Sequence, residues 1–341
     1  MSRSSPTCPI DRVFQSTMAH RPRSMFIRNA LLNERKAGLP RATVKLKPTS
    51  VTRRTLIAAG AAVMANRAAG GQTPEKRPVV LGQVSLSFYA VTGAVVHELL
   101  ERLGHSVEVR EGPHEQIFPL LGDGQIDLMA AVWLPEGHAA YWARYGAQAL
   151  EIAKLYEGAR FFWAVPSYVP TEEVASIEDL SKPTVTERMT KVIQGIGAGA
   201  TITTFSQKAV EKYGLAQLGY SLRPGTQAEW IGAFNSAVAE RRWIVFPTWA
   251  PQYLNRDGQL RALVDPRGVL GGVNHAALVA PRYRFQQLPE MTRTVLTRVE
   301  IGLDGVTEMD WMVNVESRTP RDAARIWLRA NEQRVSAWLR P

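Results

Sequence analysis

The chain has 341 residues, of which 45% are hydrophobic, and a formal net charge of +10. This length and hydrophobic content exclude a disordered chain and allow two domains or one large two-lobed domain. The charge is uneven, because residues 1–71 contain 13 of the 41 Lys and Arg residues but only two of the 31 acidic residues. The remaining body is nearly neutral, which excludes the basic surface that a nucleic-acid-binding protein needs.

The first 71 residues contain the pattern of an export signal. The segment Thr52-Arg-Arg-Thr-Leu-Ile57 precedes a short apolar run, and its paired arginines resemble a twin-arginine signal. The run of about ten residues is shorter than the roughly 20 that span a membrane. We expect cleavage between Ala68 and Thr73 and a free periplasmic product; the alternative is a disordered basic tail. The one cysteine, Cys8, lies in this segment, so we expect no disulfide, thiol nucleophile or cysteine-ligated zinc in the mature chain.

From residue 79 onward, strand and helix patterns alternate. Continuous apolar or alternating runs predict strands, and apolar residues at three- and four-residue spacing predict helices. The predicted strands are Val79–Ser85, Val107–Arg110 and Ile126–Trp133, and the predicted helices are Gly93–Leu103 and Glu115–Leu121. Strands that alternate with helices indicate an α/β fold with a mostly parallel sheet.

Two places in the chain have the pattern of a crossover between lobes. The strand Ala159–Pro166 leads into Ser167–Pro170, an extended piece bracketed by prolines. A second buried strand, Arg242–Pro247, also ends at a proline. An amphipathic helix that starts after Thr319 then packs on a lobe. We therefore expect two lobes joined by two crossovers.

No pattern of catalytic residues is present. None of the six histidines forms HExxH, and no GxSxG elbow occurs, so we expect no metal site and no enzymatic activity. The stretch Gly195–Ala200 fits the loose form GxGxxA of a dinucleotide loop, but no acidic residue lies between Glu211 and Glu229 to bind the ribose. A nucleotide cofactor is therefore not expected. Such a turn before a helix also binds carboxylates through backbone N–H groups.

Two tryptophans stand in matching contexts. Trp133 and Trp249 each follow an apolar strand, and each precedes a proline by two residues. Residues just past the strand ends of an α/β sheet line the ligand crevice. The alternative for either tryptophan alone is a place in the core. A pair of indole faces suits a quaternary ammonium, which donates no hydrogen bond and is attracted by the ring quadrupoles.

Residues 78–341 resemble the substrate-binding proteins of ABC importers for glycine betaine and related quaternary-ammonium compounds. The similarity lies in the segments "VWLPEGHAAYWARYG", "AVPSYVP", "FPTWAPQYL" and "DAARIWLRANEQRVSAW", in this order along the chain. The resemblance implies a two-lobed type II periplasmic binding fold that closes over its ligand, and an ABC permease as partner. It divides the chain into a first lobe, 78–164 plus 250–341, and a second lobe, 165–249.

The resemblance also assigns the ligand contacts. Trp133 and Trp249 match cage tryptophans that hold the cation, and Phe88 or Tyr89 replaces a missing wall. Backbone amides near Ser87 and Gly199, together with Gln252, hold the carboxylate, although the family often has histidine at the position of Gln252. The predicted ligand contacts are Ser87, Phe88, Tyr89, Trp133, His138, Gly199, Ala200, Trp249 and Gln252.

The altered cage positions leave other functions open. The same fold can bind another small carboxylate or an amino acid, and it can serve as a ligand sensor for a membrane receptor. We expect a monomeric periplasmic protein that delivers glycine betaine or a related zwitterion to an ABC importer, without a cofactor.

Overall fold

The computed structural model describes residues 77–340 of the chain. The predicted export signal, its cleavage site and Cys8 lie outside these residues. The strands are β1 Val79–Val84, β2 Val107–Gly112, β3 Leu128–Leu134, β4 Ala149–Pro166, β5 Val192–Gln194, β6 Ser221–Arg223, β7 Phe246–Ala250, β8 Leu260–Ala262 and β9 Asn274–Pro281. The helices are α1 Ser87–Arg102, α2 His114–Gly122, α3 Ala139–Tyr145, α4 Pro183–Arg188, α5 Thr201–Lys212, α6 Gln227–Ala239, α7 Arg282–Gln287, α8 Glu290–Leu296, α9 Leu303–Asn314, α10 Pro320–Ala330 and α11 Glu332–Trp338.

One mixed sheet runs through most of the described chain, in the order β2-β1-β3-β9-β4-β7, with β8 also paired to β4. The strand β1 is parallel to β2 and β3, whereas β9 is antiparallel to both β3 and β4. The mixed α/β architecture is confirmed, but the expectation of a mostly parallel sheet is wrong for this sheet. The reason is that β4 and β7 are antiparallel and β9 inserts between β3 and β4.

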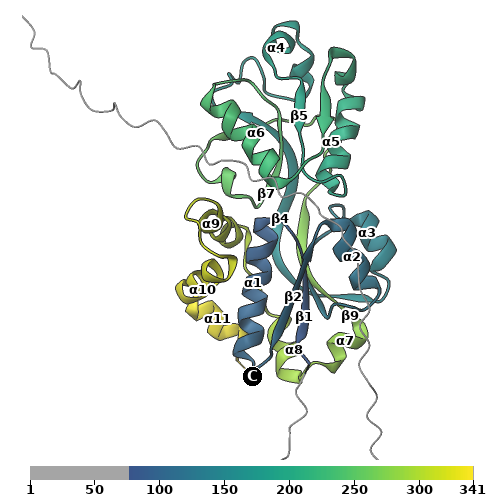
Figure 1. Cartoon of the computed structure of the whole chain (residues 1–341), viewed down its shortest axis with the longest axis vertical. Coiled ribbons are helices and arrows are strands. Elements are labelled where there is room, and N and C mark those ends of the chain that lie inside the picture. The colour runs from purple at the N-terminus through teal and green to yellow at the C-terminus, as the bar shows by residue number, and fades with distance from the viewer. Residues whose placement is uncertain (1–76, 341) are drawn as a thin grey trace, which may run out of the picture. The chain divides into compact units, whose positions relative to one another are not determined.

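The long strand β4 joins two packing units. Its residues Ala149–Ala159 pair with β9, and its residues Arg160–Ala164 pair with β7. Figure 1 shows β4 passing from the part of the sheet beside α1 to the part beside α5 and α6. The first crossover is therefore a continuous strand that lies ahead of the predicted crossover at Ser167–Pro170.

Two hydrophobic clusters fill the described chain. The first surrounds α1, whose residues Leu99 and Leu100 are fully buried, and it includes residues of α9 and α10. The second surrounds Trp163 at the far end of β4. The strand β8 pairs with β4, and Leu263 and Leu270 belong to the second cluster. We therefore propose that the chain divides into the two lobes expected from the sequence, except that residues 260–270 belong to the second lobe.

Two helices differ in extent from the sequence pattern. The helix α1 begins at Ser87, six residues before the predicted start at Gly93. The C-terminal amphipathic segment forms two helices, α10 and α11, that meet at Asn331. The side-chain amide of Asn331 donates to the carbonyl of Trp327 at 2.9 Å, a local hydrogen bond that competes with helix continuation.

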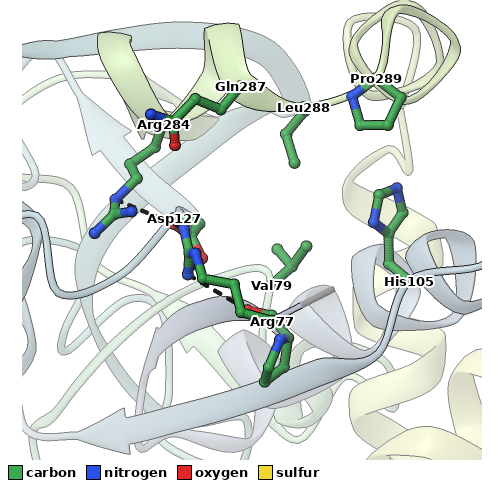
Figure 2. A pocket seen from close by; sticks show the side chains of 9 residues that line it. Arg77, Val79, His105, Asp127, Arg284, Gln287, Leu288 and Pro289 are labelled. Atoms are coloured by element: carbon green, nitrogen blue, oxygen red, sulfur yellow. Dashed lines mark hydrogen bonds and ion pairs between the residues drawn. The ribbon is translucent and has the colours of Figure 1, made fainter. Parts of the chain in front are cut away.

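A buried carboxylate fixes the start of the sheet. Asp127 accepts the backbone N–H of Val80 at 2.8 Å, and its backbone N–H donates to the Val80 carbonyl at 2.8 Å. Its two carboxylate oxygens also accept from the guanidinium of Arg77 at 2.7 and 2.9 Å (Figure 2). Arg284 of α7 approaches the same carboxylate at 3.4 Å. Asp127 thereby ties the segment before β1 to β3 and α7.

Replacing Asp127 tests this role. We expect Asp127→Ala to lower the free energy of unfolding by about 2–3 kcal/mol, because hydrogen bonds to charged groups are lost and a buried backbone donor is left with one partner fewer. Chemical denaturation of residues 72–341 measures the change. Asp257→Ala, at an exposed turn, is the control and should change stability by no more than about 0.5 kcal/mol. Equal effects of the two substitutions would contradict the anchoring role.

Candidate functional site

The turn after β3 positions Trp133 and His138. A bulge in the pairing of β3 with β9 lies between Met129 and Val132, where Ala131 has a positive φ of 65°. Such a bulge redirects the side chains that follow it. The ring nitrogen Nδ1 of His138 accepts the backbone N–H of Trp133 at 2.9 Å, and the indole of Trp133 donates to the hydroxyl of Tyr156 at 2.9 Å. Trp133 is therefore held rigidly and is fully buried.

The strand β7 carries the second tryptophan. The ring of Trp249 stacks on Trp230 of α6, with centroids 4.8 Å apart and an interplanar angle of 19°. Trp230 is fixed in turn by its indole N–H, which donates to the carbonyl of Pro247 at 2.8 Å. The indole N–H of Trp249 is buried and has no hydrogen-bond partner among the described residues. Trp249 thus has an unused donor at the lobe interface.

The first turn of α1 places an aromatic ring against both tryptophans. The ring of Phe88 lies 5.8 Å from Trp133 and 5.5 Å from Trp249, measured between centroids. Tyr89 follows it and lies 4.0 Å from Phe88. Phe88 and Tyr89, expected from the sequence to replace a missing wall of the cage, both lie in this first turn of α1. The arrangement is an aromatic cluster with members from α1, β3 and β7.

A small cavity lies inside this cluster. Its volume is about 10 Å³, roughly the space that one water molecule needs. It is lined by Leu86, Phe88, Tyr89, His114, His138, Phe161, Ile196, Ala200, Thr201, Ile202 and Trp249. These residues come from both lobes, and none of them is Asp, Glu, Lys or Arg. We call it the aromatic cavity.

The structure brings five of the nine predicted ligand contacts to this lining: Phe88, Tyr89, His138, Ala200 and Trp249. The other four are Trp133, Ser87, Gly199 and Gln252. Trp133 packs behind the lining, against Phe88 and Phe161. The ring centroids of Trp133 and Phe161 are 5.0 Å apart.

The remaining three predicted contacts, Ser87, Gly199 and Gln252, do not line the cavity and take part in other hydrogen bonds. The Ser87 hydroxyl accepts from Gln227 and Asn314, each at 3.0 Å. The Gly199 carbonyl accepts from Tyr141 at 3.0 Å. The side-chain carbonyl of Gln252 accepts the N–H of Leu254 at 2.7 Å, while its amide nitrogen is buried without a partner among the described residues.

Sequence reasoning missed several residues of the lining, above all His114 and Phe161. Phe161 lies in β4 at the point where the strand passes between its two pairing partners. His114 begins α2 immediately after Pro113. A lone histidine at a helix start gives no signal of binding by itself; its meaning comes from the residues that the fold places around it.

Several hydrogen bonds hold the two lobes together around the cavity. Tyr141 of α3 donates to the carbonyl of Gly199 at 3.0 Å, and Gln227 of α6 donates to the hydroxyl of Ser87 at 3.0 Å. The hydroxyl of Thr201 donates to the carbonyl of Gly137. The described conformation is therefore closed over the aromatic cavity.

Both histidines of the cavity are neutral near pH 7. Burial lowers the pKa of His114 to about 4, and burial lowers the pKa of His138 well below its usual range. Because Nδ1 of His138 accepts the Trp133 N–H, the neutral ring carries its proton on Nε2. This nitrogen lies 3.3 Å from the hydroxyl of Tyr89. The Tyr89 oxygen accepts there, so its own proton is free to be donated.

The described residues contain neither a metal cluster nor a membrane span. Between residues 77 and 340, no group of three His, Cys, Asp or Glu side chains is arranged to hold a metal ion. No helix in this range has the length and hydropathy to cross a membrane.

Comparison with known proteins identifies the family. A family model described as the substrate-binding domain of an ABC-type glycine betaine transport system matches residues 77–330. The chain belongs to this family. Its members are the substrate-binding proteins of ABC importers, which bind small ligands and work with permease subunits. The resemblance seen in the sequence is confirmed.

Individual relatives are more distant. The glycine betaine/carnitine transport binding protein GbuC of Listeria monocytogenes is 25% identical over 158 residues, which are 46% of this chain and 52% of that relative. The alignment thus spans about half the length of GbuC. Lactococcal OpuAC in its closed form with glycine betaine has a TM-score of 0.69 and 22% identity, covering 77% of this chain and all of that chain. A choline-binding protein in complex with choline has a TM-score of 0.68 and 21% identity, covering 77% and 91% of the two chains. These structures confirm the type II periplasmic binding fold.

The neutral histidines make stability depend on pH. An unfolded histidine gains its proton near pH 6.5, whereas folded His114 gains it only near pH 4. The stability that neutral His114 contributes is therefore lost as the pH falls from about 6.5 to about 4, by on the order of 3 kcal/mol. We expect His114→Gln to reduce this acid loss by about that amount in denaturant titrations between about pH 7 and pH 4.

The comparison with the unsubstituted protein cancels the contributions of titrating groups that do not interact with His114. Burial raises the pKa of Asp310 to about 6, so its protonation favours the folded state as the pH falls, in the opposite sense to His114. This contribution is the same in both proteins. Parallel stability curves for the two proteins would contradict the buried, neutral state of His114.

Proposed function

We propose that this chain binds a small quaternary-ammonium zwitterion, such as glycine betaine, between its lobes and delivers it to an ABC permease. The observation that carries the proposal is the aromatic cavity, which combines Phe88, Phe161 and Trp249 with a lining free of charged side chains. Aromatic faces attract a quaternary cation by about 0.5–2 kcal/mol per desolvated contact. The relative GbuC is named for glycine betaine and carnitine, and the similar OpuAC structure contains bound glycine betaine.

The absence of charged side chains from the lining supports a ligand without net charge. A buried ion needs a partner of opposite charge or several hydrogen bonds. A zwitterion supplies its own counter-charge, whereas an amino acid also needs acceptors for its ammonium protons. The same consideration makes a betaine a better match than choline, which carries a net positive charge.

Binding by this cavity requires the lobes to move. A trimethylammonium group is several times larger than the water-sized cavity of about 10 Å³. The hydrogen bonds Tyr141–Gly199 and Gln227–Ser87 join the lobes, so the ligand enters when they are broken and is enclosed when they form again. In this proposal Trp249 and Phe88 contact the cation, and Trp133 supports them from behind.

The proposal includes export and a monomeric product. Residues 52–57 would direct export through the cytoplasmic membrane, and cleavage near residues 68–73 would release a periplasmic protein. The predicted carboxylate contacts, which are the amides near Ser87 and Gly199 together with Gln252, remain part of the proposal. A free periplasmic protein would then meet its permease by diffusion.

Calorimetric titration of residues 72–341 with glycine betaine tests the function. We expect saturable binding that weakens about tenfold or more in Trp249→Ala, because a cation–π contact and a stacked wall are lost together. Trp311→Ala is the matched control, because Trp311 lies on α9 beside Arg256. The affinity of this variant for glycine betaine should be unchanged. Absence of binding to glycine betaine, proline betaine, carnitine and choline would overturn the ligand assignment and favour another small carboxylate.

A further inference from the structure

We infer that Asp310 and Asn314 of α9 are positioning residues that orient the hydroxyl of Ser87. Ser87 in turn accepts the hydrogen bond from Gln227 that joins the lobes, so the pair on α9 stabilises the closed conformation. Neither Asp310 nor Asn314 lines the aromatic cavity, and their effect on a ligand is therefore exerted through closure of the lobes. The inference rests on the proposed function, because ligand binding is the step that requires this closure.

Asp310 is a buried carboxylate with donors from three segments of the chain. It is fully buried on α9, which lies beside α1 (Figure 1). One oxygen accepts the backbone N–H of Tyr253 at 2.8 Å, and the other accepts from the side-chain amide of Asn314 at 2.9 Å. The hydroxyl of Ser87, at the start of α1, is a third donor. A buried carboxylate needs such donors, and in binding them it fixes their positions relative to one another.

The Ser87 hydroxyl connects this network to the other lobe. Its oxygen accepts from Asn314 and from Gln227 of α6, each at 3.0 Å. A hydroxyl has one proton and two lone pairs, so donation to Asp310 leaves both lone pairs for the two amides. Donation to a carboxylate also makes the hydroxyl oxygen a stronger acceptor, because hydrogen bonds in a chain polarise one another. Since both α9 residues and Ser87 belong to the first lobe, the hydroxyl is oriented before the lobes close.

Gln227 is held equally firmly on the second lobe. It is the first residue of α6 and follows Thr226, which forms a capping box with Glu229. Trp230, in the same turn of α6, stacks on Trp249 with ring centroids 4.8 Å apart. One helix turn therefore carries both the donor of the closing hydrogen bond and the ring that supports a wall of the aromatic cavity. Formation of the bond and completion of the cavity are thus coupled.

Asp310 also supports the end of β7. Tyr253, whose backbone N–H it accepts, begins a short 3-10 helix that ends at Asn255. The side-chain amide of Asn255 donates to the carbonyl of Trp249 at 2.8 Å. Asp310 thus has two routes to the cavity, one through the hydroxyl at the start of α1 and one through this turn. Only the first route makes its effect depend on Gln227.

A double-mutant cycle on residues 72–341 separates the two routes. Asp310→Asn keeps the shape of the side chain but replaces one acceptor oxygen with an N–H donor. We expect this substitution to weaken glycine betaine binding about fivefold in calorimetry, the effect of one hydrogen bond. Gln227→Ala should have a similar effect, and Asp310→Asn should add less than about twofold in the Gln227→Ala background. Stopped-flow measurements should show most of the loss as faster release of the ligand.

Two matched substitutions serve as controls. Tyr141→Phe removes the hydrogen bond to Gly199, which joins the lobes at a separate contact, so Asp310→Asn should keep its full effect of about fivefold in that background. Asp127→Asn changes another buried carboxylate, which bonds the N–H of Val80 in β1. It should lower the stability of the protein but change the affinity for glycine betaine less than about twofold.

Asn314→Ala is a second variant for the case that thermal unfolding shows Asp310→Asn to be unfolded. Asn314 is only half-buried, and it donates directly to the Ser87 hydroxyl. Its substitution should weaken glycine betaine binding about threefold, and this loss should also largely disappear in the Gln227→Ala background, because both residues act through Ser87.

The results that would contradict the inference differ from those that would contradict the proposed function. If the folded α9 variants bind glycine betaine as the unsubstituted protein does, if their effects add to that of Gln227→Ala, or if Gln227→Ala binds normally, the positioning role is overturned and the proposed function stands. If the unsubstituted protein binds none of glycine betaine, proline betaine, carnitine and choline, the proposed function fails and the positioning role fails with it.

Discussion

The strand β4 belongs to both halves of the sheet, and the position of the candidate site follows from this constraint. One end of β4 pairs with β9 and the other with β7, so β3 and β7 bring their ends to the same region from opposite lobes. Trp133 and Trp249 stand at those ends, and Phe88 of α1 contacts both rings. A ligand cleft at strand ends is the usual place in α/β proteins. In this chain the continuous strand β4 sets the distance between the two walls of the cleft, which carry Trp133 and Trp249.

The polar side chains of the cavity indicate the kind of ligand as much as its aromatic rings do. The lining has no ionised side chain, yet it contains Tyr89, His114 and His138, which are held neutral by burial near pH 7. The backbone N–H of Trp133 fixes the tautomer of His138 and leaves the Tyr89 proton available. Neutral donors next to aromatic faces suit a molecule that carries both charges itself. The family defines the general role, which is that of a substrate-binding protein. The neutral donors and aromatic faces of the cavity are the basis for the ligand class proposed for this chain.

The sequence was sufficient to predict the family, the two-lobed fold and five residues of the cavity lining. Those predictions succeeded because the strand-end tryptophans and the aromatic pair Phe88 and Tyr89 are local sequence patterns. The antiparallel insertion of β9 was not predictable, since it depends on pairing between segments more than a hundred residues apart. His114 and Phe161 were missed for the same reason. Each acquires its meaning from neighbours in space.

A crystal structure of residues 72–341 with glycine betaine tests the central claim most directly, which is that the aromatic cavity between the lobes is the ligand site. We predict the trimethylammonium group within about 6 Å of the ring centroids of Trp249 and Phe88. We predict the carboxylate beside the backbone amides near Ser87 and Gly199. Betaine bound away from both lobes' aromatic rings, for example in the cavity beside Asp127 and Arg284 shown in Figure 2, would contradict the account.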